Sequence, residues 1–312
     1  MAAVVEIENL VKRYKELVAV DHFSLRVGEG EILGLLGPNA SGKTTVIQCA
    51  LSLRPYDRGN IRIFGEPMGP EDYGRKARIG IVPQNIAVME ELTVYENIDY
   101  FCGLYIRDRG RRRSYVREAV AFAGLEEYER IYPAKLSAGI RRRLNIACGI
   151  AHKPDLIFFD EPTVAVDPRS RNQILQWITE LNRQGATIIY TSHYMEEVEQ
   201  ICSRIAIIDK GRNIAEGTKE RLKKMLKNTE TIAVEVPGLV RERLQELKAL
   251  PHAYEVSCEE EWVRIKFSGG NQNLFHVLDY LREHEILTGR IYTEQPTLND
   301  VFLEMTGREM QD

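Results

Sequence analysis

The sequence lacks any long apolar segment. No run within its 312 residues approaches the roughly 20 apolar residues that a membrane-spanning helix requires. The first residues, MAAVVEIENLVKRY, carry early acids and no apolar core of a signal peptide. We therefore expect a chain without a membrane span or a secretion signal of its own.

Cysteine is also sparse. The five cysteines are odd in number and scattered, and they stand at Cys49, Cys102, Cys148, Cys202 and Cys258. Their wide spacing argues against a disulfide framework or a zinc site. It predicts a reducing cytoplasm, in which these thiols act as small buried hydrophobic residues.

A strong charge of either sign is missing as well. With 42 basic and 46 acidic residues the net charge is -4, which gives no pull toward nucleic acid or an anionic surface. The cluster RDRGRRR at 107–113 predicts a solvated loop between helices, with a binding surface as the alternative. The 44% hydrophobic content suffices for one large or two modest globular domains.

Short β-branched runs separated by loop signals cover the first part of the chain. A helix is expected from Lys43 to about Leu53, and Thr93 with Glu96 predicts the capped start of a helical stretch reaching Gly124. Nearly continuous apolar runs, typical of parallel strands buried on both faces, alternate with helices after Leu136. Expected strands are 4–10, 20–27, 31–36, 61–64, 79–82, 156–159 and 186–191. Residues 1–225 thus predict a doubly wound α/β domain with a helical subdomain at about 86–151.

The remaining residues, 229–312, predict a separate α+β module. The basic, polar segment 219–228 is taken as the exit from the first domain. The expected order is strand 231–236, helix 239–249, strands 254–258 and 262–267, helix 273–283 and strand 286–292. That βαββαβ order indicates a ferredoxin-like module. A last amphipathic helix follows, with Thr297 as its cap. We expect this module to serve dimerisation or packing, with binding of a small effector as the alternative.

The segment GPNASGKT, Gly37 to Thr44, has the pattern of a phosphate-binding P-loop. An apolar strand precedes it and a helix follows, as that loop requires. Successive N–H groups and the helix N-terminus favour phosphate oxygens, Lys43 can reach the outer phosphates, and the Thr44 hydroxyl can ligate Mg²⁺. Ala40 stands where glycine is possible, which costs about 1 kcal/mol if its φ is positive.

Polar residues follow the buried strands at the edge where the P-loop lies. In LIFFDEP, Asp160 is placed to hold Mg²⁺ and Glu161 to polarise an attacking water. His193, which ends ATIIYTSH, can contact the γ-phosphate, and Gln84 can meet the Mg²⁺ or the water. Tyr14 can stack on an adenine ring, although a half-buried surface tyrosine is an alternative.

Taken in order, these motifs resemble an ATPase subunit of an ABC transporter over about the first 220 residues. The resemblance implies two such domains placed head to tail around two ATPs, each closing on the partner's nucleotide. It also implies matches for a signature stretch (LSAGI, with Ser137 and Gly139), a dimer-contact loop (Asp167) and a docking subdomain for a membrane partner. Tyr14 matches the adenine-stacking residue, Gln84 the link to that partner, Asp160 the magnesium acid, Glu161 the base and His193 the switch histidine. The phosphate loop matches Gly37, Pro38, Asn39, Ala40, Ser41, Gly42, Lys43, Thr44 and Thr45.

The sequence departs from the family pattern at two places. LSAGI stands for the usual LSGGQ, and TVAVDP, residues 163–168, stands for TSGLDP. If the missing amide at Ile140 made one hydrogen bond to a charged group, closure would weaken roughly 10- to 100-fold. We expect an active, slower ATPase, with a nucleotide-gated regulatory subunit of little turnover as one alternative.

The resemblance implies ATP and Mg²⁺ as cofactors and a separate transmembrane permease as partner. The chain would work as a homodimer or with a second ATPase subunit, on the inner face of the cell membrane. The ending PTLNDVFLEMTGRE resembles the exporter branch that handles drugs, sodium or polysaccharide. A soluble ABC-type protein acting on ribosomes or DNA is the other alternative, and the acidic balance disfavours it.

Overall fold

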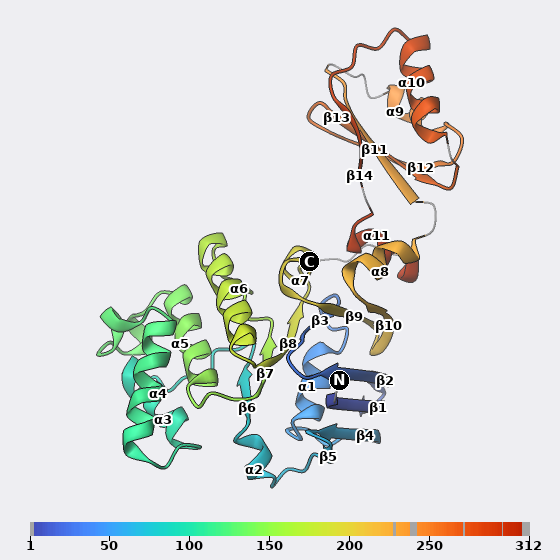
Figure 1. The fold of residues 1–312 in the computed structure, drawn as a ribbon. Helices are drawn as coiled ribbons and strands as arrows, with labels where there is room; N and C mark the ends of the chain where they lie inside the picture. Colours follow the sequence, from blue (N-terminus) through green and yellow to red (C-terminus); the bar gives the residue numbers. More distant parts are fainter. Residues whose placement is uncertain (1–2, 227–228, 238–241, 271, 295, 308–312) are drawn as a thin grey trace. The chain divides into compact units, whose positions relative to one another are not determined.

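The computed structural model describes residues 3–226, 229–237, 242–270, 272–294 and 296–307. The chain forms two compact units, divided between Lys219 and Glu220 (Figure 1). Each unit is described by itself. Among the described residues, no helix combines the length and the apolar character that crossing a membrane demands.

The first unit begins with an antiparallel sheet in the order β2-β1-β4-β5. Val5 on β1 lies opposite Val27 on β2 and Ile63 on β4, so these apolar side chains share one face. The strands are β1 (Ala3–Tyr14), β2 (Leu17–Gly28), β4 (Arg58–Ile63) and β5 (Glu66–Pro67).

The second sheet of this unit has the order β10-β9-β3-β8-β7-β6. All its pairs are parallel except β9 with β10. Its strands are β3 (Ile32–Leu36), β6 (Ile79–Val82), β7 (Leu156–Asp160), β8 (Thr187–Ser192), β9 (Arg204–Asp209) and β10 (Arg212–Gly217). The predicted α/β class with buried parallel strands is confirmed, whereas β9 and β10 were not predicted.

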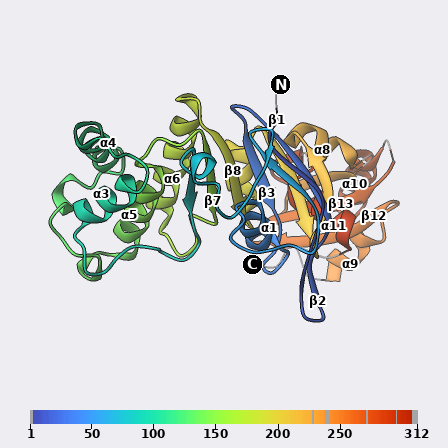
Figure 2. The same ribbon diagram turned by 90° about the horizontal axis from the view of Figure 1, so that it is seen from below.

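Helices flank this sheet and extend to one side of it. Both views place α3, α4 and α5 together, away from β1 and β2 (Figures 1 and 2). The helices are α1 (Lys43–Ala50), α2 (Tyr73–Lys76), α3 (Val94–Gly103), α4 (Arg109–Phe122), α5 (Ala138–Ile150), α6 (Pro168–Arg183) and α7 (Met195–Ile201), with short 3₁₀ turns at Glu126–Tyr128 and Pro133–Lys135. The Thr93–Glu96 capping box is present at α3. Helix α1 ends earlier than expected.

The prediction that the arginine-rich residues 107–113 form a loop is wrong. Arg109 to Arg113 form the first turns of α4, and the Asp108 side chain caps that helix by accepting from the Arg111 N–H. Cationic residues at a helix N-terminus oppose the helix dipole. Packing of Val116, Ala119 and Val120, all buried, outweighs that local penalty.

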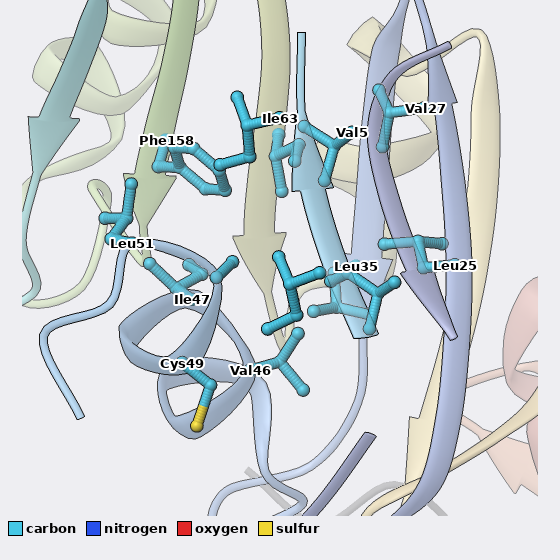
Figure 3. Packing of buried hydrophobic residues seen from close by; sticks show 14 of the residues in the cluster. Val5, Leu25, Val27, Leu35, Val46, Ile47, Cys49, Leu51, Ile63 and Phe158 are labelled. Carbon is cyan, nitrogen blue, oxygen red and sulfur yellow. The ribbon is translucent and has the colours of Figure 1, made fainter. Parts of the chain in front are cut away.

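A continuous hydrophobic core joins the two sheets through α1. Val5, Val27 and Ile63 from the antiparallel sheet meet Ile47 of α1 and Phe158 of β7 (Figure 3). Burial of these side chains fixes α1, and therefore the loop before it, against the carboxyl ends of the parallel strands.

The second unit contains a four-stranded antiparallel sheet in the order β12-β13-β11-β14. Numbered along the module, this order reads 2-3-1-4 and confirms the ferredoxin-like prediction. Helices α9 and α10 pack apolar residues such as Leu247 and Val277 onto it. The elements are α8 (Lys219–Met225), β11 (Thr229–Glu235), α9 (Glu242–Lys248), β12 (Ala253–Glu259), β13 (Trp262–Ser268), α10 (Asn273–Glu283), β14 (Ile291–Glu294) and α11 (Leu298–Thr306).

Three details of this unit differ from the expectations or fall outside the description. The segment taken as a linker begins with helix α8, and β14 starts at Ile291 rather than Ile286. Residues 238–241, where the second-unit helix was expected to begin, lie outside the described part. Cys258 is exposed, whereas the other four cysteines are buried as predicted. The Thr297 cap of α11 is present.

Candidate active site

The P-loop connects β3 to α1 and lies tightly against a neighbouring strand. A Cβ added to Gly37 would come 2.2 Å from the Ile208 carbonyl oxygen, so only glycine fits there. Gly42, at φ 110°, caps α1 in a conformation that other residues avoid. These two glycines let the main chain turn while α1 starts directly at Lys43.

The middle of this loop carries a local strain. Ala40 has φ +61°, the left-handed region that costs an L-residue roughly 1 kcal/mol. The neighbouring Ser41 is buried, and its hydroxyl oxygen has no hydrogen-bond partner. A buried hydroxyl without a partner is uncommon, and an anion in the loop would supply one.

Lys43 is the central cation of the site and is only 4% exposed. Its Nζ donates to the Gly37 carbonyl at 2.7 Å and to the Pro38 carbonyl at 3.0 Å. The same nitrogen lies 2.9 Å from Glu161 Oε1, which makes a buried ion pair. The structure therefore brings the predicted phosphate-binding lysine and the predicted base together.

Three predicted site residues converge on the Glu161 carboxylate. Besides Lys43, Gln84 donates from Nε2 to Oε2 at 3.2 Å, and His193 Nδ1 lies 3.4 Å from Oε2 without making a hydrogen bond. Glu161 has φ +46°, and its N–H donates to the Thr191 hydroxyl at 2.9 Å. This bond holds the residue just beyond β7 with its side chain toward Lys43.

Asp160 ends β7 beside the loop. It accepts a hydrogen bond from the Thr191 hydroxyl at 2.8 Å. Burial raises the pKa of the Asp160 carboxyl, while hydrogen bonds from Thr191 and Thr44 oppose the rise. A cation beside this carboxylate would offset the cost of its burial.

The donors at this point have the chemistry that Mg²⁺ prefers. They are one hydroxyl, from Thr44, and one carboxylate, from Asp160, which leaves positions for water and phosphate oxygens. In the described part of the chain, no cluster of three or more histidine, cysteine, aspartate or glutamate side chains could form an all-protein cage. The residues therefore fit a magnesium ion that arrives with a nucleotide.

The predicted closing residues form a second group. Ser137 caps α5 and accepts from the Ile140 N–H at 3.4 Å, and Asp167 caps α6 and accepts from the Ser170 N–H at 3.0 Å. A Cβ added to Gly139 would lie 3.3 Å from Ser170 Oγ and 3.8 Å from Asp167 Oδ2, so the two helix starts are neighbours. Ser137 and Asp167 are exposed.

The other predicted residues lie at the margins of these groups. Tyr14 ends β1 and is 40% exposed, with the Lys12 ammonium 5.0 Å from its ring centre. Asn39 is exposed at the tip of the P-loop, and Thr45 is half-buried in the first turn of α1. These positions leave their side chains available to a ligand.

Sequence reasoning missed the residues that support the site. Arg142 on α5 is buried and donates to the carbonyls of Pro83 and Gln84 at 3.1 and 2.8 Å. Asn145, one turn further, donates to the Pro83 carbonyl and accepts from the Ala87 N–H. Their only signal was two polar residues at helical spacing on the buried side of α5.

The sequence is similar to proteins of a known family. The family model described as "ABC transporter" matches residues 20–164. The chain is 38% identical over 307 residues to the linearmycin resistance ATP-binding protein LnrL of Bacillus subtilis (strain 168), covering 98% of this chain and 99% of the relative. The chain belongs to the ABC transporter ATP-binding family. It is 36% identical over 315 residues to the Nod factor export ATP-binding protein I of Paraburkholderia xenovorans (strain LB400), covering 99% of each chain.

Solved structures of the family agree with the fold. An ATP-binding subunit of an ABC transporter matches at 25% identity with a TM-score of 0.66, covering 71% of this chain and 92% of that one. A dimeric post-hydrolysis ATP-binding cassette with ADP and Pi matches at 27% identity with a TM-score of 0.64, covering 69% and 98%. This chain is thus an ATPase subunit of the ABC transporter type.

Proposed function

We propose that two copies of this chain hydrolyse Mg·ATP in a head-to-tail dimer and drive export through a permease at the inner face of the cell membrane. The observation that carries the hydrolytic part is the convergence of Lys43, Gln84 and His193 on Glu161. The direction follows from relatives matched over the whole chain, which are named for resistance and export.

Each site residue takes a role in this proposal. Lys43 and the P-loop amides hold the outer phosphates, while Thr44, Asp160 and Gln84 hold the magnesium and its water shell. Glu161 accepts the proton of the attacking water and His193 contacts the γ-phosphate. Tyr14 stacks on adenine, and Ser137, Gly139 and Asp167 close on the partner's nucleotide.

The C-terminal module, residues 229–312, serves dimerisation or regulation in this proposal, because its described part offers no cluster of three or more histidine, cysteine, aspartate or glutamate side chains that would hold a metal. It is separate from the residues that bind ATP, which lie in the first unit. Deleting it would therefore change the assembly of the complex more than the affinity for ATP.

The test compares Mg·ATP turnover of the wild-type chain, Glu161→Gln and Glu196→Gln, an exposed control on α7. Loss of the general base should lower turnover about 10²- to 10⁴-fold, whereas the control should not change. In Glu161→Gln, ATP should produce dimers by light scattering, and a tagged copy should retain an untagged one. Unchanged turnover in Glu161→Gln would overturn the catalytic assignment, and dimers that form only with a second ATPase chain would overturn the homodimer.

The direction of transport is tested with the permease in inside-out vesicles. ATP added outside should move substrate into the lumen, and Glu161→Gln should abolish that movement. Loss of substrate from preloaded vesicles instead would show import.

A further inference from the structure

Glu197 is a buried carboxylate to which the proposed mechanism gives no role. It lies on α7, four residues after His193, and is 3% exposed. A carboxylate out of water is costly unless other groups hold it, and an apolar side chain would fill the same space without that cost. Its burial therefore requires partners that offset the lost hydration of the carboxylate.

One oxygen of Glu197 collects three hydroxyl groups. Oε2 accepts from Tyr190 OH and Ser192 Oγ, each at 2.7 Å, and from Thr163 Oγ1 at 3.0 Å. Tyr190 and Ser192 belong to β8, which leads into His193, and Thr163 belongs to the loop that follows Glu161. The carboxylate thus joins two segments that both carry proposed catalytic residues.

The other oxygen faces the start of α6. Glu197 Oε1 lies 3.4 Å from Arg171 Nε, one turn beyond the Asp167 cap. The Arg171 guanidinium lies 4.6 Å from the centre of the Tyr194 ring, and that ring is 4.1 Å from the His193 ring. Glu197 and Arg171 therefore link the Asp167 loop to the turn that carries His193.

Strand β8 contacts Glu197 on one face and the acid pair, Asp160 and Glu161, on the other. Side chains alternate along a strand, so Thr191 points away from Tyr190 and Ser192. Its hydroxyl contacts Asp160 and the Glu161 N–H. A shift of β8 caused at Glu197 would consequently move Thr191, His193 and the acid pair together.

We propose that Glu197 is a positioning residue for hydrolysis, which fixes the segment 163–168 and the His193 turn in one arrangement. Through Glu197, contact of a partner chain with the Asp167 loop changes the position of His193. The inference rests on the proposed function of Glu161 and His193. It concerns placement of the catalytic groups, and Glu197 itself touches neither nucleotide nor water.

The test measures kcat and KM for Mg·ATP in Glu197→Gln, Thr163→Val and the double variant, with Glu196→Gln as control. Misplacement of catalytic groups should lower kcat about 10- to 100-fold in Glu197→Gln. KM should stay within about threefold, because the P-loop is untouched. Thr163→Val should lower kcat less, and the double variant should match Glu197→Gln alone, because the Thr163 hydroxyl acts through its bond to Glu197.

The outcomes separate this inference from the proposed function. Wild-type turnover that does not depend on Glu161 overturns the proposed function and the inference with it. Glu161-dependent turnover that survives in Glu197→Gln overturns the inference alone. Independent effects that multiply in the double variant, or a fall in melting temperature with unchanged kcat, show a structural role only. If Glu197→Gln does not fold, Thr163→Val and Tyr190→Phe decide, since each removes one hydroxyl and should lower kcat at unchanged KM.

Discussion

The side of the site that we propose to hold phosphate differs from the side that we propose to close on a partner. On the phosphate side Lys43, Asp160 and Glu161 are each 5% exposed or less. Lys43 of α1 pairs with Glu161 after β7, and Asp160 accepts a hydrogen bond from Thr191 of β8. On the closing side Ser137, Ala138 and Asp167 are exposed. Ser137 and Asp167 each cap a helix by accepting from the N–H group three residues later, so these bonds are local.

This difference explains where the chain departs from the family pattern. A change in a buried, mutually bonded group leaves a polar partner unsatisfied and costs folding free energy. A change at an exposed helix start costs little in the single chain and is felt only when two chains meet. The departures at Ala138, Ile140 and the segment 164–166 lie on that side.

The largest expected effect comes from breaking the phosphate side. Lys43→Met leaves the buried Glu161 without its cation, which should lower the free energy of unfolding of the first unit by about 3 kcal/mol. ATP affinity should also fall about 10- to 100-fold through loss of a charged contact. Denaturant melts and nucleotide titration measure the two effects.

Lys153→Met provides the matched control for this change. Lys153 pairs with Glu118 at the surface, where both side chains are 51% exposed, so its loss should cost under about 1 kcal/mol. Equal losses in the two variants would contradict the contrast between a buried and a surface pair.

Much of the phosphate side could be predicted because its signals are local. The P-loop, the apolar strand before it and the helix after it occupy consecutive residues, and acids after a buried strand indicate one edge of a sheet. The contact of Gln84 with Glu161 joins residues 77 positions apart. The sequence predicted only that Gln84 meets the Mg²⁺ or the water, and the sheet order β8-β7-β6 brings the two strand ends together.

The supporting residues could not be predicted in the same way. Glu197 looks like a surface acid in MEEVEQ, and only the packing of α7 against β8 buries it. Arg142 stands in the run RRR at 141–143, which does not show which arginine is buried, yet it donates to the main chain of the Gln84 loop. Their roles depend on distant segments, for which the sequence contains no spacing signal.

A smaller effect should follow from restoring the family's usual glutamine at position 140 on the closing side. Ile140→Gln returns a polar amide to the α5 start, so ATP-dependent dimerisation should strengthen about 10- to 100-fold at nearly unchanged stability of the single chain. Light scattering in the Glu161→Gln background measures the dimer. Ile140→Leu is the control, since it keeps the site apolar. Equal dimer affinities for Gln and Leu would show that this position makes no polar contact across the dimer.

The smallest effects separate three alanines that occupy positions of possible glycines. Ala40 and Ala165 have φ +61° and +58°, while Ala138 lies in the first turn of α5. Glycine relieves the left-handed strain, so Ala40→Gly and Ala165→Gly should each raise the free energy of unfolding by about 0.5–1 kcal/mol, after allowing for glycine's greater freedom in the unfolded chain. Ala138→Gly should lower it by up to about 1 kcal/mol, because glycine is a poor helix former.

For a unit of this size, 1 kcal/mol corresponds to a shift of about 2–4 °C in melting temperature, which calorimetry resolves. A gain at Ala138, or a loss at either of the others, would contradict the assignment of strain from the backbone angles. If the signs hold, one alanine on each side of the site stores strain, and burial alone does not decide where the chain tolerates it.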